Sequence, residues 1–342
     1  MATILVTGGC GFIGSHLCAA LAVAGHRVRV LDDLSTGSEA RLPKGTTFLR
    51  GDIGHAAALT EAMEGVDACF HLAAIASVER AVLDWTGTHR TNLSATIALF
   101  DIARRRKVPV VYASSAAVYG PGGPPTGTLT GRPGGGYGGS EALEEDAPTL
   151  PLSAYGADKL GCEQHARVAG HVHGVPTMGL RFFNVFGPGQ DPASPYSGVI
   201  SIFCDRLRRG LPIDIFGDGR QTRDFVFVGD VVRALIAALP LASIQAPVLN
   251  VCTGTAITIR HLAEVIAEVV GLVPDIRHRP GRAGEIAHSV GSARQGAHLL
   301  GTTSTVPLHE GLRATLDHMR SNDLAFAGAR DQRPTVSETA SA

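Results

Sequence analysis

The chain has 342 residues, of which 44% are hydrophobic and 18% charged, so it is long enough to bury a sizeable core. Its 30 basic and 31 acidic side chains leave a net charge of -1, which argues against recognition of nucleic acid or of an anionic membrane surface by overall charge. The six cysteines show no C-x-x-C pair and no zinc-type or disulfide-type spacing. We therefore expect no metal site, and free cysteines in a reducing compartment.

Short β-rich runs alternate with helical patterns through the first half of the chain. The expected strands are 3–6, 27–31, 47–49, 68–72 and 108–113, and the expected helices are 15–24, 56–63 and 91–106. Alternating strands and helices predict an α/β fold with a doubly wound parallel sheet of the Rossmann type, covered by helices on both faces.

The second half of the chain continues this alternation less regularly. Residues 120–139 hold ten glycines and four prolines and are expected to form a surface loop, followed by an acidic, solvated segment at 141–146. Further strands are expected at 178–183 and 249–252, a helix at 199–209 and a strand-helix run at 225–239. This order predicts two parts, a cofactor domain of residues 1–183 plus 224–256 and an interleaved, smaller C-terminal α/β substrate domain of residues 184–223 plus 257–320.

Two terminal features complete the organisation. Residues 321–342 are small and polar with no apolar period, which predicts a disordered tail. No leader-type segment precedes the first expected strand, and no run of about eighteen apolar residues follows. We therefore expect a cytoplasmic protein without a membrane segment.

A glycine pattern follows the first expected strand and opens the first helix. Gly8, Gly11 and Gly14 permit a tight turn, close approach of a pyrophosphate to the backbone, and packing of the helix on the strand. The free N–H groups of the helix N-terminus attract the anion. This context predicts a dinucleotide site.

Asp32 closes the second expected strand, where a carboxylate can accept both ribose hydroxyls of an adenosine. A 2′-phosphate would be repelled there, and no arginine directly follows, so NAD is favoured over NADP. Asp52, at the end of the third strand, can frame the adenine. Alternatively, Asp52 is an ordinary turn aspartate, and Asp32 caps a helix or a turn.

Tyr155 and Lys159 stand at helical spacing downstream of the serine pair Ser114 and Ser115. Residues four apart share a helix face, so an ammonium lies beside a phenol and favours its phenolate form. Such a pair usually marks an exposed helix face when it stands alone. With the upstream glycine loop it predicts a tyrosine that works as a base.

With these residues in place, the chain resembles the extended short-chain dehydrogenase/reductase family, and within it the UDP-sugar 4-epimerases, including those acting on N-acetylated sugars. The resemblance covers about residues 1–320. It is carried by the segments 7–14 (TGGCGFIG), 31–37 (LDDLSTG), 71–74 (HLAA), 112–120 (YASSAAVYG), 181–188 (RFFNVFGP) and 216–224 (FGDGRQTRD).

The resemblance implies epimerisation at C4 of a UDP-hexose, UDP-glucose/UDP-galactose or their N-acetylated forms, through a 4-keto sugar and a bound NAD. It implies that Ser115, Tyr155 and Lys159 are catalytic. It also implies a homodimer that pairs through helices.

The same resemblance assigns two binding sets. For the cofactor it implies Gly8, Gly11, Phe12, Ile13, Gly14, Asp32, Asp33, Asp52, Ile53, Leu72, Ala73, Ala74, Asn92, Ser114, Tyr155, Lys159 and Phe182. For the UDP-sugar it implies Ser77, Ser115, Asn184, Val199, Phe216, Arg223, Arg282, Glu285 and Ser289. Here Arg223 and Arg282 would clamp the two phosphates, and Ser289 would leave room for a 2-acetamido group.

Other activities of the family remain alternatives. A 4,6-dehydratase typically has an acidic pair where this chain has Ala116 and Ala117, which cannot transfer protons, so it is disfavoured. A UDP-glucuronate 4-epimerase or decarboxylase, and a non-catalytic NAD sensor that kept only the fold, stay open, although the sensor is disfavoured by the presence of both Tyr155 and Lys159.

Overall fold

The structure of the protein is a computed structural model, which describes residues 1–121, 142–194, 198–281, 286–301 and 304–331. The predicted loop 120–139 lies outside these residues except for its first two positions. So do Arg282 and Glu285, two of the residues predicted to bind substrate.

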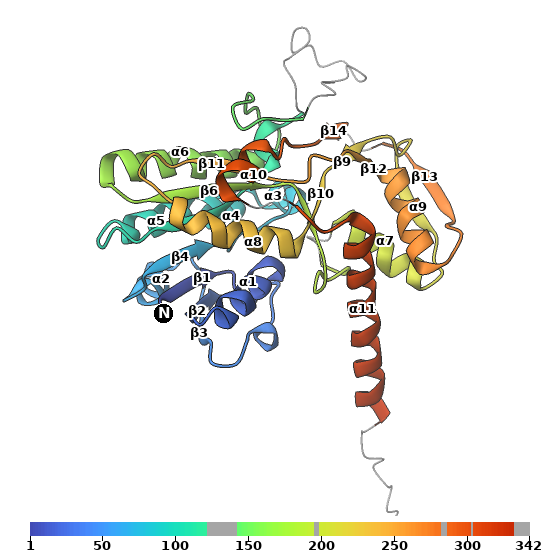
Figure 1. Ribbon diagram of the computed structural model, residues 1–342, viewed down its shortest axis with the longest axis horizontal. Coiled ribbons are helices and arrows are strands. Elements are labelled where there is room, and N and C mark those ends of the chain that lie inside the picture. Colours follow the sequence, from blue (N-terminus) through green and yellow to red (C-terminus); the bar gives the residue numbers. More distant parts are fainter. Residues whose placement is uncertain (122–141, 195–197, 282–285, 302–303, 332–342) are drawn as a thin grey trace, which may run out of the picture.

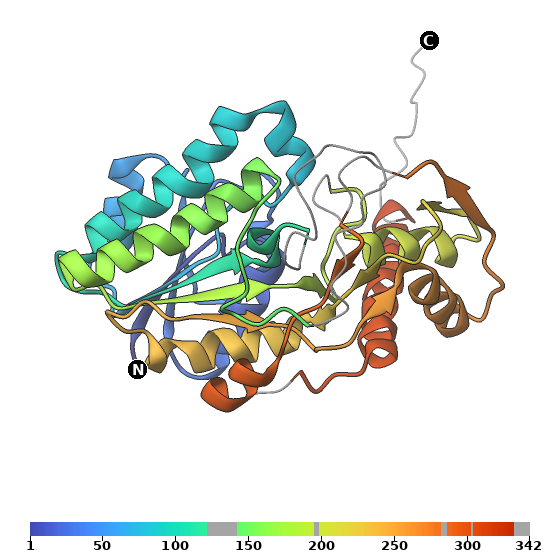
Figure 2. The ribbon, with the colours of Figure 1, turned by 90° about the horizontal axis from the view of Figure 1, so that it is seen from above.

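A seven-stranded parallel sheet in the spatial order β11-β6-β5-β4-β1-β2-β3 forms the centre of the larger part of the molecule (Figure 2). The strands are β1 (Thr3–Thr7), β2 (Arg27–Asp32), β3 (Thr47–Arg50), β4 (Ala68–His71), β5 (Val110–Ser115), β6 (Thr177–Phe182) and β11 (Val248–Val251). The strand order reverses between β1 and β4, and the carboxyl ends of strands at such a reversal flank a ligand crevice. The doubly wound parallel sheet predicted from the sequence is confirmed.

Helices cover both faces of this sheet. One face is covered by α1 (Phe12–Val23), α8 (Val228–Ala238) and α10 (Arg294–Leu300), and the other by α2 (Ala56–Met63), α5 (Ala95–Ala103) and α6 (Ala154–His173). Every residue of β4 and β6 is buried, because both faces are covered. The strands therefore read as apolar runs rather than as alternating patterns.

Short elements connect these layers. They are η1 (Glu39–Arg41), α3 (Val78–Leu83), α4 (Trp85–His89), the π-helical turn η2 (Arg90–Ser94), and the 3-10 turns η3 (Ala116–Tyr119) and η4 (Leu239–Leu241). The single helix predicted for 91–106 is thus divided into η2 and α5. Lys107 after it has a φ of 52°, which a right-handed helix cannot continue.

The smaller part lies beside the larger one, with α7 (Val199–Arg208), α9 (Ile259–Val270) and α11 (Leu308–Asp331) among its elements (Figure 1). It has its own core, to which Phe203, Leu262 and Leu312 contribute. Its strand pairs are β7 (Asn184–Phe186) with β10 (Phe225–Phe227) and β8 (Ile213–Phe216) with β13 (Ile276–Arg279), and β9 (Thr222–Arg223) lies between β12 (Ile257–Thr258) and β14 (His288–Ser289).

Three boundaries differ from the prediction. Residues 225–227 were expected in the cofactor domain, but they form β10, which pairs with β7 and buries Phe225 in the core of the smaller part. Helix α10 was expected in the smaller part, with residues 257–320, but it contacts α8 and β11 and buries Leu300 in the core of the larger part. The tail expected from Ser321 is wrong for residues 321–331, because α11 continues to Asp331. Leu312, Leu316 and Met319 anchor the first half of α11, and residues 320–331 continue a helix that is already formed.

All six cysteines are buried and unpaired, as expected for small core residues. Among the residues described, no helix combines the length and apolarity needed to cross a membrane. The same residues contain no group of three or more His, Cys, Asp or Glu side chains that could hold a metal ion.

Candidate active site

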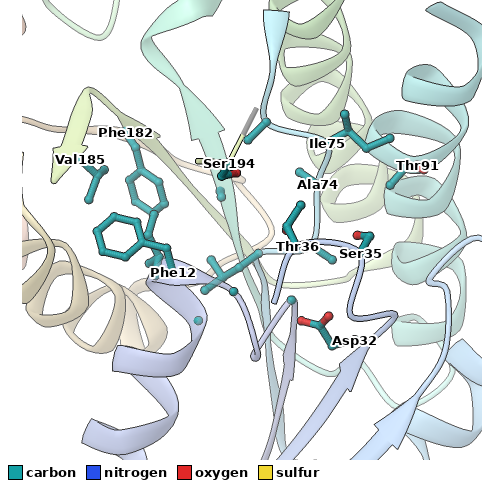
Figure 3. A pocket seen from close by; sticks show the side chains of 18 of the residues that line it. Phe12, Asp32, Ser35, Thr36, Ala74, Ile75, Thr91, Phe182, Val185 and Ser194 are labelled. Atoms are coloured by element: carbon teal, nitrogen blue, oxygen red, sulfur yellow. The ribbon is translucent and has the colours of Figure 1, made fainter. Parts of the chain in front are cut away.

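A cavity of about 480 Å³ opens where the central strands end (Figure 3). It collects nearly all of the residues predicted to bind the cofactor. The predicted residues that line it are Gly8, Gly11, Phe12, Ile13, Gly14, Asp32, Asp33, Asp52, Ile53, Leu72, Ala73, Ala74, Ser114, Ser115, Tyr155, Lys159, Phe182 and Asn184.

The glycine loop has the shape of a cradle for an anion. Gly8 has a φ of 71°, and a Cβ there would lie 2.7 Å from the nitrogen of Ala73. A Cβ on Gly14 would lie 2.1 Å from the carbonyl oxygen of Gly8. Gly11 is the N-cap of α1 and offers no side-chain cap, so the first N–H groups of the helix are available to a ligand. These residues fit the pyrophosphate of NAD.

Asp32 is held rigidly at the end of β2. Its two carboxylate oxygens accept hydrogen bonds from the backbone nitrogens of Cys10 at 2.9 Å and Leu34 at 2.8 Å. Burial raises the pKa of Asp32, while these two hydrogen bonds lower it. Figure 3 shows Asp32, Ser35 and Thr36 on one side of the cavity, across from the rings of Phe12 and Phe182. Asp32 thus works as a turn cap and still faces the cavity, where it fits a ribose diol.

Asp33 and Asp52 also organise turns. Asp33 accepts from the nitrogen of Ser35 at 2.8 Å, and Asp52 accepts from the nitrogen of Gly54 at 2.8 Å. Both residues line the cavity as well. Asp52 can therefore stabilise a turn and also lie next to a bound adenine, as the sequence predicts.

Ser115, Tyr155 and Lys159 converge on the other end of the cavity. Ser115 ends β5 and accepts a hydrogen bond from the nitrogen of Ala117 at 3.2 Å, which leaves its own hydrogen for another partner. Tyr155 lies in the first turn of α6, a helix capped by the hydroxyl of Ser153. The Nζ atom of Lys159 is 5.8 Å from the centre of the Tyr155 ring.

Lys159 is almost completely buried, with 4% of its surface exposed. Its Nζ donates to the carbonyl oxygen of Ala113 at 2.8 Å. An ammonium carries three N–H donors, so this bond aims the group and leaves two more for ligands. The arrangement fixes a buried positive charge next to the phenol ring of Tyr155.

His71 and Asn92 brace the cavity wall from behind. His71 Nδ1 lies 2.7 Å from Thr7 Oγ1, and its Nε2 lies 2.9 Å from Thr96 Oγ1. Burial, followed by the charge of Lys159, lowers the pKa of His71 to about 3. Asn92 bonds the backbone nitrogen and oxygen of Ile75 with its amide and does not itself line the cavity. Contact of Asn92 with the cofactor stays a prediction.

Four of the residues predicted to bind the UDP-sugar, namely Val199, Phe216, Arg223 and Ser289, lie on elements of the smaller part. Arg223 in β9 pairs with Ser289 in β14, and the oxygen of Phe216 accepts from the side chain of Gln221. Arg223 Nη1 donates to the backbone oxygens of Thr222 and Ile286 at 2.8 and 2.7 Å. Val199 begins α7, and neither it nor Phe216, Arg223 and Ser289 lines the cavity.

Asp224 joins the three segments around this group. It is fully buried and accepts from the backbone nitrogens of Thr253 at 2.8 Å, Gly254 at 2.9 Å and Gly291 at 3.4 Å. The hydroxyl of Thr253 adds a fourth bond at 2.7 Å. Burial raises the pKa of Asp224, and the hydrogen bonds oppose this.

Ser77 is placed differently from the prediction of a sugar contact. It is buried, caps α3 by accepting from the nitrogen of Arg80 at 3.1 Å, and is absent from the cavity lining, which includes its neighbour Ala76. Substrate contact by Ser77, Arg282 and Glu285 stays a prediction.

Several cavity residues were not predicted. They are Leu31, Ser35, Thr36, Arg41, Gly51, Ile75, Ala76, Arg80, Thr91, Ala113, Phe183, Val185, Gly189, Gln190, Asp191, Ser194 and Gly198. Ser35 and Thr36 belong to the segment 31–37 that carried the resemblance, so a signal for them existed. Gln190 has a buried side-chain oxygen without a hydrogen-bond partner among the described residues, which only the structure reveals.

Comparison with known proteins agrees with this geometry. Residues 4–252 match the model of the NAD dependent epimerase/dehydratase family. The UDP-glucose 4-epimerase of Mycolicibacterium smegmatis is 35% identical over 327 residues, which cover 93% of this chain and 98% of that protein.

Two solved structures are similar along nearly the whole chain. The UDP-glucose 4-epimerase of Thermus thermophilus in complex with NAD is 36% identical with a TM-score of 0.82, over 93% of this chain and 99% of that one. The UDP-N-acetylglucosamine 4-epimerase of Methanobrevibacter ruminantium, in complex with UDP-N-acetylmuramic acid, is 32% identical with a TM-score of 0.83, over 94% and 99%. The chain therefore belongs to the NAD-dependent epimerase/dehydratase family, within the extended short-chain dehydrogenases/reductases that its sequence resembles.

Proposed function

We propose that the protein is an NAD-dependent UDP-sugar 4-epimerase that interconverts UDP-glucose and UDP-galactose through a 4-keto intermediate. The observation that carries this proposal is the convergence of Ser115, Tyr155 and Lys159 on the cavity that also holds the glycine cradle and Asp32. The relatives named UDP-glucose 4-epimerase support the choice of sugar nucleotide.

In this mechanism Tyr155, as phenolate, takes the proton from the 4-hydroxyl of the sugar. NAD, when bound, supplies the acceptor that takes the hydride from C4 and gives it back to the opposite face of the keto sugar. Tyr155 then returns the proton to the new 4-hydroxyl, so protons and electrons balance over one turnover.

Ser115 and Lys159 support Tyr155 in this cycle. The hydroxyl of Ser115, with its oxygen occupied by the nitrogen of Ala117, is oriented to donate to the sugar oxygen. Lys159, aimed by Ala113, holds the ribose next to the nicotinamide and favours the phenolate of Tyr155.

The UDP half is proposed to bind in the smaller part. Arg223 is assigned to the phosphates, because guanidinium groups match phosphate oxygens, and Phe216 to the uracil. Asn184, which begins β7 and lines the cavity, is assigned to the sugar phosphate between the two parts. Val199 and Ser289 complete the assignment, and the small side chain of Ser289 leaves room for an N-acetylated sugar.

The test is a pair of measurements on the purified protein. Absorbance after gel filtration reports tightly held NAD, and incubation with UDP-galactose should yield UDP-glucose. Exchangeable cofactor and no turnover on UDP-glucose, UDP-N-acetylglucosamine or UDP-glucuronate would contradict the proposal and favour an NAD sensor. Loss of carbon dioxide from UDP-glucuronate would identify a decarboxylase instead.

We also propose that two copies pair through α3, α4 and α6, which contact one another. Val82, Leu83 and Trp85 on α3 and α4 are 76%, 87% and 69% exposed, an apolar surface that association would bury. Light scattering of wild type and a Trp85→Glu variant measures this association, and a wild-type monomer at high concentration would exclude it.

The unpaired cysteines support a cytoplasmic location.

A further inference from the structure

A buried ion pair lies directly behind the candidate catalytic residues. Glu163 follows Tyr155 and Lys159 on α6 at steps of four residues, so the three share one helix face. Arg181 in β6 meets Glu163 there, and the two are only 4% and 3% exposed. The mechanism proposed above uses neither residue.

The geometry of the pair is bidentate. Arg181 Nε donates to Glu163 Oε1 at 2.9 Å, and Nη2 donates to Oε2 at 2.7 Å. Ser114, which lines the cavity beside Ser115, donates its hydroxyl to Glu163 Oε1 at 2.5 Å. Glu163 thus connects α6 both to β6 and to the end of β5.

Arg181 is fixed independently of Glu163. Its Nη1 donates to the hydroxyl of Tyr119 at 2.8 Å and to the backbone oxygen of Glu145 at 2.9 Å. Tyr119 in turn donates to Asn250 at 2.7 Å. Glu145 accepts from the nitrogen of Asn250 at 2.9 Å, which corrects the expectation that segment 141–146 is merely a solvated face.

The charge of Glu163 matters because of its position. It follows Lys159 by one helical turn, and an unpaired carboxylate there would offset the positive field of the ammonium at Tyr155. Arg181 cancels that charge. Burial alone would lower the pKa of Arg181, but the hydrogen bonds and charge of Glu163 raise it, so the guanidinium stays charged.

We propose that Glu163 and Arg181 are a positioning pair for the reaction: they lock α6 against β5 and β6, and they keep the region behind Lys159 neutral so that its ammonium dominates the field at Tyr155. This inference rests on the proposed role of Tyr155 as the base. Neither residue lines the cavity, so the pair acts through Tyr155 and Lys159 and not by contact with substrate.

Other titratable groups near the pair and near Tyr155 come from every neighbouring element. They are Asp158 and Cys162 on α6, His89 on α4, His71 on β4, Tyr112 on β5, Tyr119 on η3, Glu145 in the loop before α6, and Arg167 further along α6. Burial keeps His71 neutral and raises the pKa of Tyr119 to about 12, so neither carries charge at neutral pH. Asp158 bonds His89 at 2.7 Å.

The decisive variant is Glu163→Gln, which keeps the shape of the side chain and removes its charge. Arg181 stays held by Tyr119 and the Glu145 carbonyl, and its charge is no longer cancelled. Eight residues of helix rise about 12 Å, so the acid limb of the kcat profile should move down by about half a pH unit to one unit. The KM for the UDP-sugar should stay within about twofold, because the binding residues are untouched.

Two further variants separate charge from structure. Glu163→Gln combined with Arg181→Met restores a neutral pair, and its pH profile should return toward that of the wild type. Arg167→Gln removes a cation of the same helix that is exposed to water, and screening should leave the profile unchanged. An unmoved or upward-shifted profile in Glu163→Gln would overturn the inference.

A measurement without turnover keeps the inference testable if a variant is slow. The pH titration of phenolate absorbance, taken as the difference between each protein and its Tyr155→Phe derivative, should show the same downward shift in Glu163→Gln. A wild type that is inactive on all UDP-sugars contradicts the proposed function. An active wild type whose Glu163→Gln variant shows no shift contradicts this inference alone.

Discussion

The two parts of the molecule build their sites in different ways. In the larger part, the cofactor residues follow strands of four to six residues in one continuous parallel sheet, packed on both faces. In the smaller part, Arg223 and Ser289 stand on strands of only two residues, and buried Asp224 joins the segments around them. The proposed cofactor site is therefore built on the core of the larger part, whereas the proposed nucleotide site depends on a few polar contacts.

This comparison predicts separable effects. Substitutions at the ends of the central strands should change cofactor retention or chemistry. Substitutions around Asp224 should change the KM for the UDP-sugar and leave bound NAD in place.

The largest effect is expected from Tyr155→Phe. Removing the base should lower kcat by about three orders of magnitude, because general acid-base catalysis contributes about 10²- to 10⁴-fold. NAD content and KM should stay near those of the wild type, since the ring is kept. Tyr119→Phe removes a hydroxyl that lies outside the cavity lining and should lower kcat less than tenfold. Near-native turnover of Tyr155→Phe would remove this residue as the base.

Gly14→Ala should destabilise the fold of the larger part. Its Cβ would lie 2.1 Å from the oxygen of Gly8, a backbone atom that cannot move aside. We expect a loss of about 3 kcal/mol in unfolding free energy, and no NAD after gel filtration. In the control Gly11→Ala the corresponding distance is 3.2 Å, so a small shift suffices and the fold should be retained. Equal melting temperatures for the two variants would contradict the cradle geometry.

Asp224→Asn should act on the smaller part. The amide replaces one carboxylate oxygen by a donor that faces N–H groups, which leaves buried donors unpaired at a cost of about 1 to 3 kcal/mol. The KM for the UDP-sugar should rise about tenfold or more, while NAD content is unchanged. Thr253→Val removes the hydroxyl bond to Asp224 and the bond that this hydroxyl accepts from the nitrogen of Thr255, but it keeps the three backbone bonds to Asp224, so its effect should be smaller. Loss of NAD together with an unchanged KM would contradict the expectation that substitutions around Asp224 affect UDP-sugar binding and not cofactor retention.

The sequence predicted the larger part well because its signals are local. Apolar runs between helical patterns predicted the strands within about two residues, and the loop 7–14 is recognisable by glycines at positions where a Cβ would collide with backbone. Tyr155 and Lys159 are one helical turn apart in the chain, so their proximity follows from helix geometry alone.

The remainder depends on contacts between distant segments. Asp224 bonds Gly291, and Arg181 bonds the backbone of Glu145. No periodic pattern in the sequence indicates either contact. Ser77 carries a local signal that the sequence analysis did not use, because it caps α3, and its predicted sugar contact stays a prediction. In α11, the buried side chains of Leu312 and Leu316 anchor a helix that continues through residues 321–331, which the sequence analysis assigned to a disordered tail.

The smallest effect is expected in the pH dependence of the unfolding free energy, through His71 in the larger part. His71 has a pKa of about 3 in the folded protein against about 6.5 when unfolded, so below pH 6.5 the unfolded chain binds the extra proton. Stability should be full above pH 6.5 and fall as the pH drops toward 3, by about 2 kcal/mol at pH 5 from this residue. His71→Gln does not titrate, so its unfolding free energy, although lower at pH 7, should decline less steeply between pH 7 and pH 5 in urea titrations. Parallel slopes for the two proteins would mean that His71 is protonated in the folded state, and the bracing of the cavity wall through Thr7 and Thr96 would then need a charged ring with both nitrogens donating.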